Sequence, residues 1–392
     1  MKKLLIAIIS IIMLSTNLLS QSSINNILTE IEKNNTSLLA LRKKAEAEKI
    51  GNKTQIYLQS PEFEFNYLSS NPSETGNRTD LSISQSFDFP TAYLYENQIS
   101  NIKNEQVDIE YQKQLRSLLL KTRLVCNDIV YTNALMSKMS NRIIHAKDIA
   151  NSFQSKFNVG ETNILEYNKA QLNLLKISKD LELLEIQRNT LFSELTRLNG
   201  GIFIDFTDSQ FHLPSIPVDF EQWYLSADQN NPVLNWLKQE IEISQKQEKL
   251  TRALSLPKLR AGYMSESVVG ERFSGITGGL SIPLWGNKNT VKHAKANTLA
   301  IESITHDTKI QLYNHLKALH TKAISLQQNI DDYRFTLRSI DNSELLKKAF
   351  DKGEISLINY ILELSIYFES ENKLVELERN LNQTLAELNQ YN

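Results

Sequence analysis

The chain has 392 residues, of which 41% are hydrophobic and 22% charged, with a formal net charge of −2, 12 Gly, 8 Pro and 1 Cys. The near-neutral charge excludes a strongly basic nucleic-acid-binding protein, and a single cysteine excludes a scaffold held by disulfides. Glycine and proline together are about 5% of the chain, against about 12% on average, so we expect few loops and long uninterrupted elements.

The first residues predict an export signal. Two lysines follow Met1, residues 4–14 are almost wholly apolar, and Ser15, Thr16 and Ser20 come next. A positive start, a short apolar stretch and small residues are typical of a secretory signal peptide, which we place at residues 1–20. The apolar stretch is too short to span a bilayer as a retained anchor, so we expect it to be removed.

Long helices are predicted where glycine and proline are missing. Neither residue type occurs in 91–159, 161–199, 287–352 or 354–392. The first of these stretches carries apolar side chains and threonines at the alternating spacing of four and three that is typical of packed helices. This seam consists of Tyr111, Leu115, Leu118, Thr122, Val125, Ile129, Thr132, Met136, Met139 and Ile143. We expect each long helix to pack against two shorter ones, one of them at about residues 24–60.

Four segments between the helices alternate apolar and polar residues. They are 62–67, 80–89, 258–263 and 277–284. A period of two predicts strands with one apolar and one polar face. Polar loops that contain glycine separate the members of each pair, which predicts two hairpins.

The chain also repeats itself. Pro61 and Pro257 lie 196 positions apart, and the sequence FNVGE at 157–161 recurs as FDKGE at 350–354, an offset of 193. Each copy is predicted to contain a helix, a β-hairpin, a long helix, a glycine turn and a further helix. The predicted divisions are 21–199 for the first repeat, 200–219 for a linker and 220–392 for the second repeat.

Four amphipathic strands indicate a membrane channel made by several copies of the chain. A sheet of four strands has two open edges, which lipid does not tolerate, and bacterial outer-membrane barrels need at least about 8 strands. The alternative is a water-soluble sandwich packed by the apolar face. The side chains expected to face lipid are Phe63, Phe65, Leu81, Ile83, Phe87, Leu280, Ile282 and Leu284.

The paired turns at 157–161 and 350–354, each between long helices, and the segment LSIPLWG at 280–286 resemble the TolC-like outer-membrane factor family. The resemblance implies a mainly α fold with a membrane β-barrel portion. It further implies a homotrimer in the outer membrane of a Gram-negative bacterium, with one 12-stranded barrel and a helical barrel that extends into the periplasm. The chain would be the exit duct of a tripartite efflux pump, together with a periplasmic adaptor and an inner-membrane pump of the RND or ABC type.

The resemblance also assigns residues to the two turns. The turns would be periplasmic tips that contact the adaptor, through Phe157, Val159, Gly160, Glu161, Phe350, Lys352, Gly353 and Glu354. Six positions beyond each glycine, members of the family often place an acidic residue at the pore constriction. Glu166 and Asn359 occupy these positions, so Asn359 departs from the acidic pattern and Glu166 is the better candidate for the gate.

No residue pattern predicts an enzyme. The six histidines form no H-x-H, HExxH or Cys/His spacing, and no phosphate-binding loop or nucleophile elbow occurs. We therefore predict no catalytic residues, metal or cofactor. Two other functions stay open: a type I protein-secretion duct, and a periplasmic or surface coiled-coil structural protein. For an efflux duct, the short external loops favour metal ions or small molecules as cargo.

Overall fold

The structure, a computed structural model, describes residues 24–54, 56–71, 76–212, 215–285, 287–340 and 342–391. The predicted signal peptide lies outside these residues. The chain divides into two compact units, which are described separately below. The first unit comprises Met1–Leu39, Gln114–Ala227 and Tyr313–Asn392, and the second comprises Ala40–Lys113 and Asp228–Leu312.

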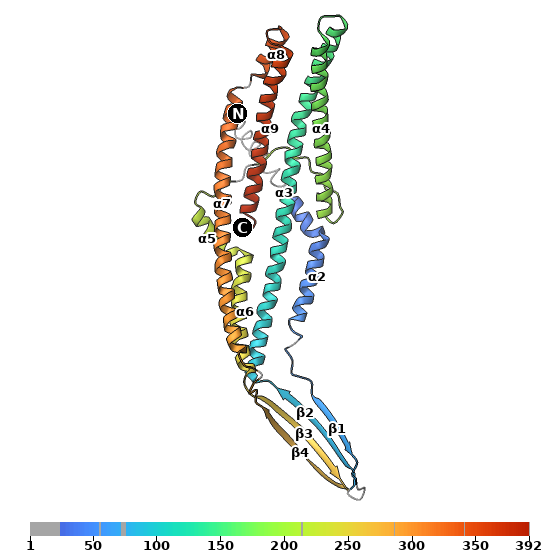
Figure 1. The fold of residues 1–392 in the computed structure, drawn as a ribbon, viewed down its shortest axis with the longest axis vertical. Coiled ribbons are helices and arrows are strands. Elements are labelled where there is room, and N and C mark those ends of the chain that lie inside the picture. The colour runs from blue at the N-terminus through green and yellow to red at the C-terminus, as the bar shows by residue number, and fades with distance from the viewer. Residues whose placement is uncertain are drawn as a thin grey trace, which may run out of the picture. The chain divides into compact units, whose positions relative to one another are not determined.

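The second unit contains one antiparallel four-stranded sheet with the strand order β1-β2-β3-β4 (Figure 1). Its strands are β1 (Glu62–Leu68), β2 (Arg78–Phe87), β3 (Lys258–Val268) and β4 (Glu271–Ser281). Both predicted hairpins are confirmed, and the second one is longer than expected because its turn is only Val269-Gly270. These two residues have φ of 48° and 87°, as a type I′ turn requires.

Two strands end earlier than predicted. β4 ends at Ser281, so Ile282 and Leu284, which were expected on a lipid-facing strand, lie beyond it. The reason is Pro283, which has no N–H to donate to the neighbouring strand. β2 likewise ends at Phe87, two residues earlier than expected.

Helices pack beside one another in the same unit. The unit contains most of α2 (Thr36–Gly51), the first part of α3 (Pro90–Asn158), α6 (Pro232–Leu254) and the first part of α7 (Thr290–Ser339). Polar contacts join them: Lys49 Nζ lies 2.6 Å from Asp108 Oδ1, and the Ser244 and Thr298 hydroxyls lie 2.7 Å apart. Their apolar core consists of Ala92, Ile99, Ile102, Ile243, Leu250 and Ala253.

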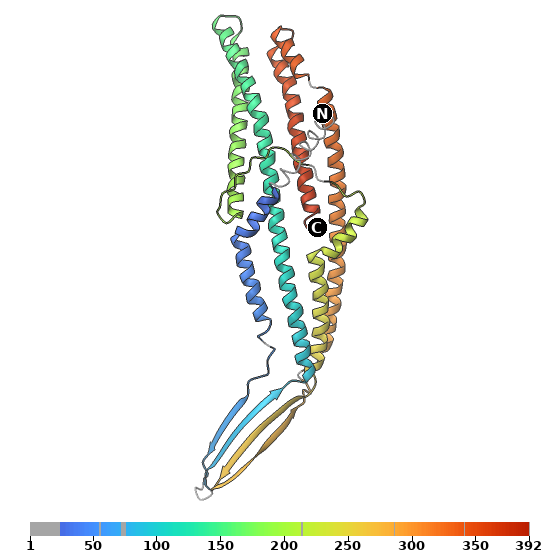
Figure 2. The same ribbon diagram turned by 180° about the vertical axis from the view of Figure 1, so that it is seen from behind.

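The first unit confirms most of the predicted long helices. α3 continues without a break to Asn158, and α4 (Ile164–Leu198) and α9 (Leu357–Leu388) follow the two glycine turns (Figures 1 and 2). The prediction of one helix over 287–352 is wrong, because α7 ends at Ser339 and α8 (Ser343–Asp351) begins after a break. Asn342 takes the N-cap position of α8, a place that short polar residues favour over the interior of a helix.

An asparagine also breaks the predicted helix over 24–60. Residues 24–34 are helical, Asn35 is not, and α2 ends at Gly51. Asn35 accepts a hydrogen bond from the Leu38 N–H at 2.9 Å, and its Nδ2 donates to the Leu198 carbonyl at 2.7 Å. Asn231 is the N-cap of α6, after α5 (Phe220–Asn230), and accepts from the Val233 N–H at 2.8 Å. The same cap thus recurs 196 residues later.

The core of the first unit includes part of the predicted linker. Ile204 and Phe206 are 7% and 2% exposed and pack with Ile31, Ile129 and Leu195. Cys126 is fully buried in the same core, and burial raises its pKa to about 12. A buried thiol with a raised pKa is chemically inert. None of the helices in the described ranges is both long and apolar enough to span a membrane.

Candidate functional site

The first tip joins α3 to α4. Gly160 has φ +77°, a conformation that costs a residue with a Cβ about 1–2 kcal/mol. The Gly160 N–H donates to the Phe157 carbonyl at 3.1 Å, and the Glu161 N–H donates to the Lys156 carbonyl at 2.8 Å. Together these two bonds end the helix with a Schellman-type cap. A Cβ on Gly160 would meet no atom within 4 Å, so the backbone angle, and not a lack of space, requires glycine.

The second tip, between α8 and α9, has the same construction. Gly353 has φ +73°, and its N–H donates to the Phe350 carbonyl at 3.0 Å, while the Glu354 N–H donates to the Ala349 carbonyl at 2.9 Å. Ser356 caps α9 by accepting from the Asn359 N–H at 3.3 Å. In the first tip the equivalent cap is Asn163, which accepts from the Glu166 N–H at 3.0 Å.

An aromatic pair closes each tip. Phe157 stacks on Tyr167 with ring centroids 5.3 Å apart, and Phe350 stacks on Tyr360 at 4.5 Å. The ring planes are 10° and 13° apart, so both pairs are nearly parallel. These ring contacts were not predicted from the sequence. The signal that could have found them is the recurrence of two aromatics ten residues apart across a glycine turn.

Most of the predicted contact residues are exposed. Val159 is 70% exposed, and Phe157 is 37% exposed. The two glycines are exposed as well, together with Glu161, Lys352 and Glu354, whereas Phe350 is half-buried. The two tips meet through a small cluster in which Phe153 of α3, Ala170 of α4 and Leu357 of α9 are buried together.

The two predicted constriction residues lie in the first turns of α4 and α9. Glu166 is half-buried, and its Oε1 lies 2.8 Å from the Nζ of Lys169. This ion pair partly neutralises its charge. Asn359 is exposed on the equivalent turn of α9. The first tip therefore holds a paired carboxylate where the second holds a neutral amide.

The sheet has one apolar and one polar face. Directly paired residues of antiparallel strands share a face, and the pairs Phe65–Leu81 and Tyr263–Ile276 are both apolar. The same face holds Phe63, Ile83, Phe87, Leu259 and Leu280. The predicted alternation is thus confirmed for every expected apolar residue that lies within a strand.

Charged side chains occupy the opposite face. Arg78 Nε of β2 lies 2.8 Å from Asp80 Oδ1 and 3.1 Å from Glu266 Oε1 of β3. In the described part of the chain, β1 and β4 pair on one side only, and all their residues are exposed. The sheet is therefore amphipathic and open at both edges.

Solved structures share this fold, although the sequence matches no known family model and no curated protein. The Campylobacter jejuni CmeC outer membrane channel is 14% identical, with a TM-score of 0.76 over 94% of this chain and 85% of that one. CusC is 12% identical, with a TM-score of 0.78 over 94% and 91% of the two chains. The outer-membrane channel OprN is 10% identical, with a TM-score of 0.79 over 94% and 89%.

The chain has the fold of a TolC-like outer-membrane channel. The predicted fold class, mainly helical with a smaller β portion, is confirmed. At 10–14% identity the likeness shows the fold alone, so the roles of the tips and of the constriction residues stay predictions. Within the described ranges, no group of three His, Cys, Asp or Glu side chains is placed to hold a metal ion.

Proposed function

We propose that this chain is one subunit of a homotrimeric outer-membrane channel of a Gram-negative bacterium, the passive exit duct of a tripartite efflux pump. Its helices extend into the periplasm, where the tips bind the hairpins of an adaptor protein that connects the duct to an inner-membrane pump. The chain itself performs no chemistry. The likeness to channels such as CmeC and OprN supports this proposal.

The observation that carries the proposal is the open amphipathic sheet. In the order β1-β2-β3-β4 each neighbour is antiparallel, so β1 and β4 also run in opposite directions. β4 of one copy can therefore pair with β1 of the next in the same antiparallel pattern. Three copies give 12 strands, an even number within the range of bacterial barrels, and closure removes every edge from lipid.

The cargo is inferred from the short turn between β3 and β4. Because β3 and β4 are joined by the two-residue turn Val269-Gly270, this hairpin adds almost nothing beyond the barrel rim. We favour a metal ion or small molecule over a secreted protein, with the inner-membrane pump as the component that selects it.

The channel is tested by closing the barrel covalently. Each variant carries one cysteine on β1 and one on β4, and all combinations of positions are tested. The native thiol is removed in every variant by Cys126→Ala. We expect oxidation to give heat-resistant trimers, and reconstituted trimers to conduct ions in planar bilayers. Matched control pairs on β2 and β3 should form bridges only within one chain. A soluble monomer without conductance would overturn the proposal.

The tips are tested separately. Arginine at Gly160 or Gly353 places a bulky cation on the surface proposed to receive the adaptor. We expect Gly160→Arg and Gly353→Arg to assemble as trimers and to lose export. Gly201→Arg is the matched control, because Gly201 also has a positive φ of +88° and open space around it but lies outside both tips. Normal export by both tip variants would refute the adaptor role.

A further inference from the structure

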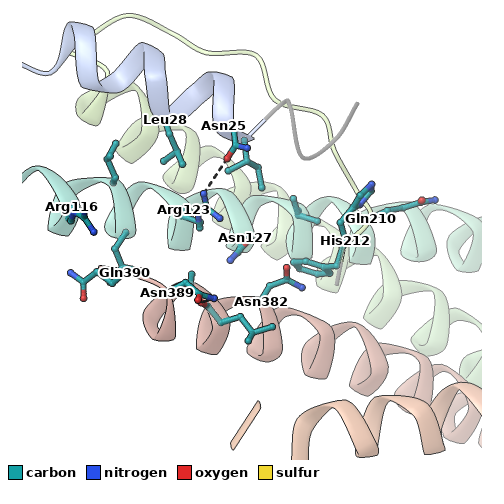
Figure 3. A pocket seen from close by; sticks show the side chains of 17 residues that line it. Asn25, Leu28, Arg116, Arg123, Asn127, Gln210, His212, Asn382, Asn389 and Gln390 are labelled. Atoms are coloured by element: carbon teal, nitrogen blue, oxygen red, sulfur yellow. Dashed lines mark hydrogen bonds between the residues drawn. The ribbon is translucent and has the colours of Figure 1, made fainter. Parts of the chain in front are cut away.

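A cavity of about 470 Å³ lies in the first unit (Figure 3). Its walls come from the helix of residues 24–34, from α3, from residues 210–212 and from the end of α9. This volume falls within the range of about 300–1,000 Å³ that is typical of small-molecule sites. Nothing in the proposed channel function uses it.

The cavity is cationic. Arg116 and Arg123 lie seven residues apart on α3, which places them on the same face of the helix, and both line the cavity. No carboxylate lines it among the described residues, and neither arginine forms an ion pair within those ranges. The Nη2 of Arg123 donates to the Asn25 Oδ1 at 3.2 Å, the bond drawn in Figure 3.

Arg123 is half-buried and has no carboxylate partner within the described ranges. Burial lowers the pKa of its guanidinium, which is the direction expected for a cation withdrawn from water. A fully buried cation needs an anionic partner because desolvation is costly, and a partly desolvated guanidinium is stabilised by one in the same way. The geometry therefore leaves room for an anion that the chain does not supply.

Two further polar side chains line the cavity with unused hydrogen-bonding groups. The side-chain amide of Asn127, a residue that is only 4% exposed and lies one turn beyond Arg123, makes no hydrogen bond within the described part of the chain. The Nδ1 of His212 is buried and also without a hydrogen-bond partner there. Buried polar groups of native proteins are nearly always satisfied, so unpartnered groups around a cavity point to a ligand.

The remaining lining limits the chemistry of that ligand. Leucine side chains such as Leu28, Leu119 and Leu385 alternate with the amides of Asn382 and Gln390. A bare inorganic anion would leave these apolar walls uncovered. An organic anion with an apolar body and an amide group could contact all three kinds of side chain.

We propose that this cavity binds a small organic carboxylate, with the guanidinium groups of Arg116 and Arg123 holding the carboxylate and the leucines covering an apolar body. The amides of Asn127 and Asn382 bind its polar groups. The site lies within one chain and exists whether or not the chain forms an export channel.

The test uses calorimetric titration of the purified full-length protein in detergent. N-acetylleucine carries the carboxylate, the amide and the apolar side chain, and N-acetylleucinamide is its uncharged counterpart. We expect N-acetylleucine to bind at least tenfold more tightly than the amide and to raise the melting temperature. Equal affinity for the two compounds, or no binding of either, would overturn the proposal. Binding of inorganic phosphate but not of N-acetylleucine would overturn the assignment to an organic ligand.

Variants connect the binding to the named residues. Arg123→Gln and Arg116→Gln should each weaken binding of N-acetylleucine at least tenfold, and Asn127→Ala severalfold. Lys147→Gln is the matched control, because it removes one positive charge from an exposed position of the same helix and should leave the affinity unchanged. Circular dichroism confirms that each variant is folded. Unchanged affinity in both folded arginine variants would show that the ligand binds elsewhere.

Discussion

The two glycine tips share one turn but differ in the helices that lead into them. Gly160 and Gly353 have φ within a few degrees of each other, +77° and +73°, and both turns end in the same pair of backbone hydrogen bonds. The first tip ends a helix of 69 residues, whereas the second follows the nine-residue α8. The local sequence thus determines the conformation of the turn. Because the chain breaks before α8, the helix that leads into the second tip is short and separate from α7.

The tips also differ in packing. Ile164 and Leu357 are equivalent positions at the offset of 193, yet Ile164 is 48% exposed and Leu357 only 3%. Phe350 stacks on Tyr360 and also on Phe153 of α3, with centroids 6.2 Å apart in the second pair. The second tip therefore packs on α3 through Phe350, whereas Ile164 of the first tip stays half exposed.

The largest expected effect is at this packed position. Leu357→Ala empties a buried site and should lower the free energy of unfolding by about 2–5 kcal/mol. Ile164→Ala, the matched control in the first tip, should cost less than about 1 kcal/mol, because much of its side chain already contacts water. Denaturant unfolding followed by circular dichroism at fixed protein concentration measures both. Equal losses would contradict the difference in burial.

Sequence patterns predicted the helices and strands better than they predicted how individual residues of these elements are buried. α3 could be predicted because the lack of glycine and proline and the regular seam both indicate one helix. The break before α8 was missed because Asn342, which takes the N-cap position there, is also compatible with the interior of a helix. The burial of Leu357 but not of Ile164 depends on a neighbouring helix, which a repeat in one sequence does not show.

The cavity could likewise not be predicted from the sequence. Asn25, Arg123, His212 and Asn382 come from four separate segments, and only the packing of those segments brings them together. No spacing rule links such positions. The tip glycines are the opposite case, because Gly160 and Gly353 follow from local backbone geometry alone.

A second prediction concerns the positive φ that the glycines of both tips share. Gly160→Ala and Gly353→Ala should each cost about 1–2 kcal/mol, because an L-residue is strained at positive φ and neither glycine has a neighbour that a Cβ would strike. The two losses should agree within about 0.5 kcal/mol. Unfolding of both variants by denaturant tests this, and a clearly larger loss at Gly353 would show that the turn depends on its packing after all.

The aromatic pairs should show a smaller difference. Double-mutant cycles for stacked rings give about 0.5–1.5 kcal/mol. We expect the coupling of Phe350 with Tyr360 to lie near the top of this range, because the rings are 4.5 Å apart and Tyr360 is 1% exposed. Phe157 and Tyr167, at 5.3 Å, should couple more weakly. Replacing each ring by leucine, singly and together, completes both cycles, and the reverse order would contradict the comparison.

The smallest expected effect concerns a carboxylate that forms ion pairs in the first repeat but lacks one of the partners in the second. Glu194 on α4 pairs with Lys121 at 2.8 Å and Arg197 at 2.7 Å, whereas the equivalent Glu387 on α9 has Gln390 in the place of Arg197. Hydrogen bonds from Arg197 and Lys121 lower the pKa of Glu194 from 4.5 to about 2. A carboxylate with a lowered pKa stabilises the fold above its unfolded pKa and loses this contribution as the pH falls through the folded value.

Glu194→Gln should therefore lower the melting temperature slightly and equally at all pH values above about 5. The difference from the unmodified protein should shrink between pH 4.5 and pH 2, the interval between the two pKa values. Because these ion pairs lie near the surface, solvent screening limits their contribution to about 1 kcal/mol or less. Glu387→Gln, the control, removes a carboxylate that has Gln390 in the place of Arg197 and should lower the melting temperature less at neutral pH. An effect of Glu194→Gln that grows as the pH falls below 4.5 would have the wrong sign for a carboxylate held ionised by its partners.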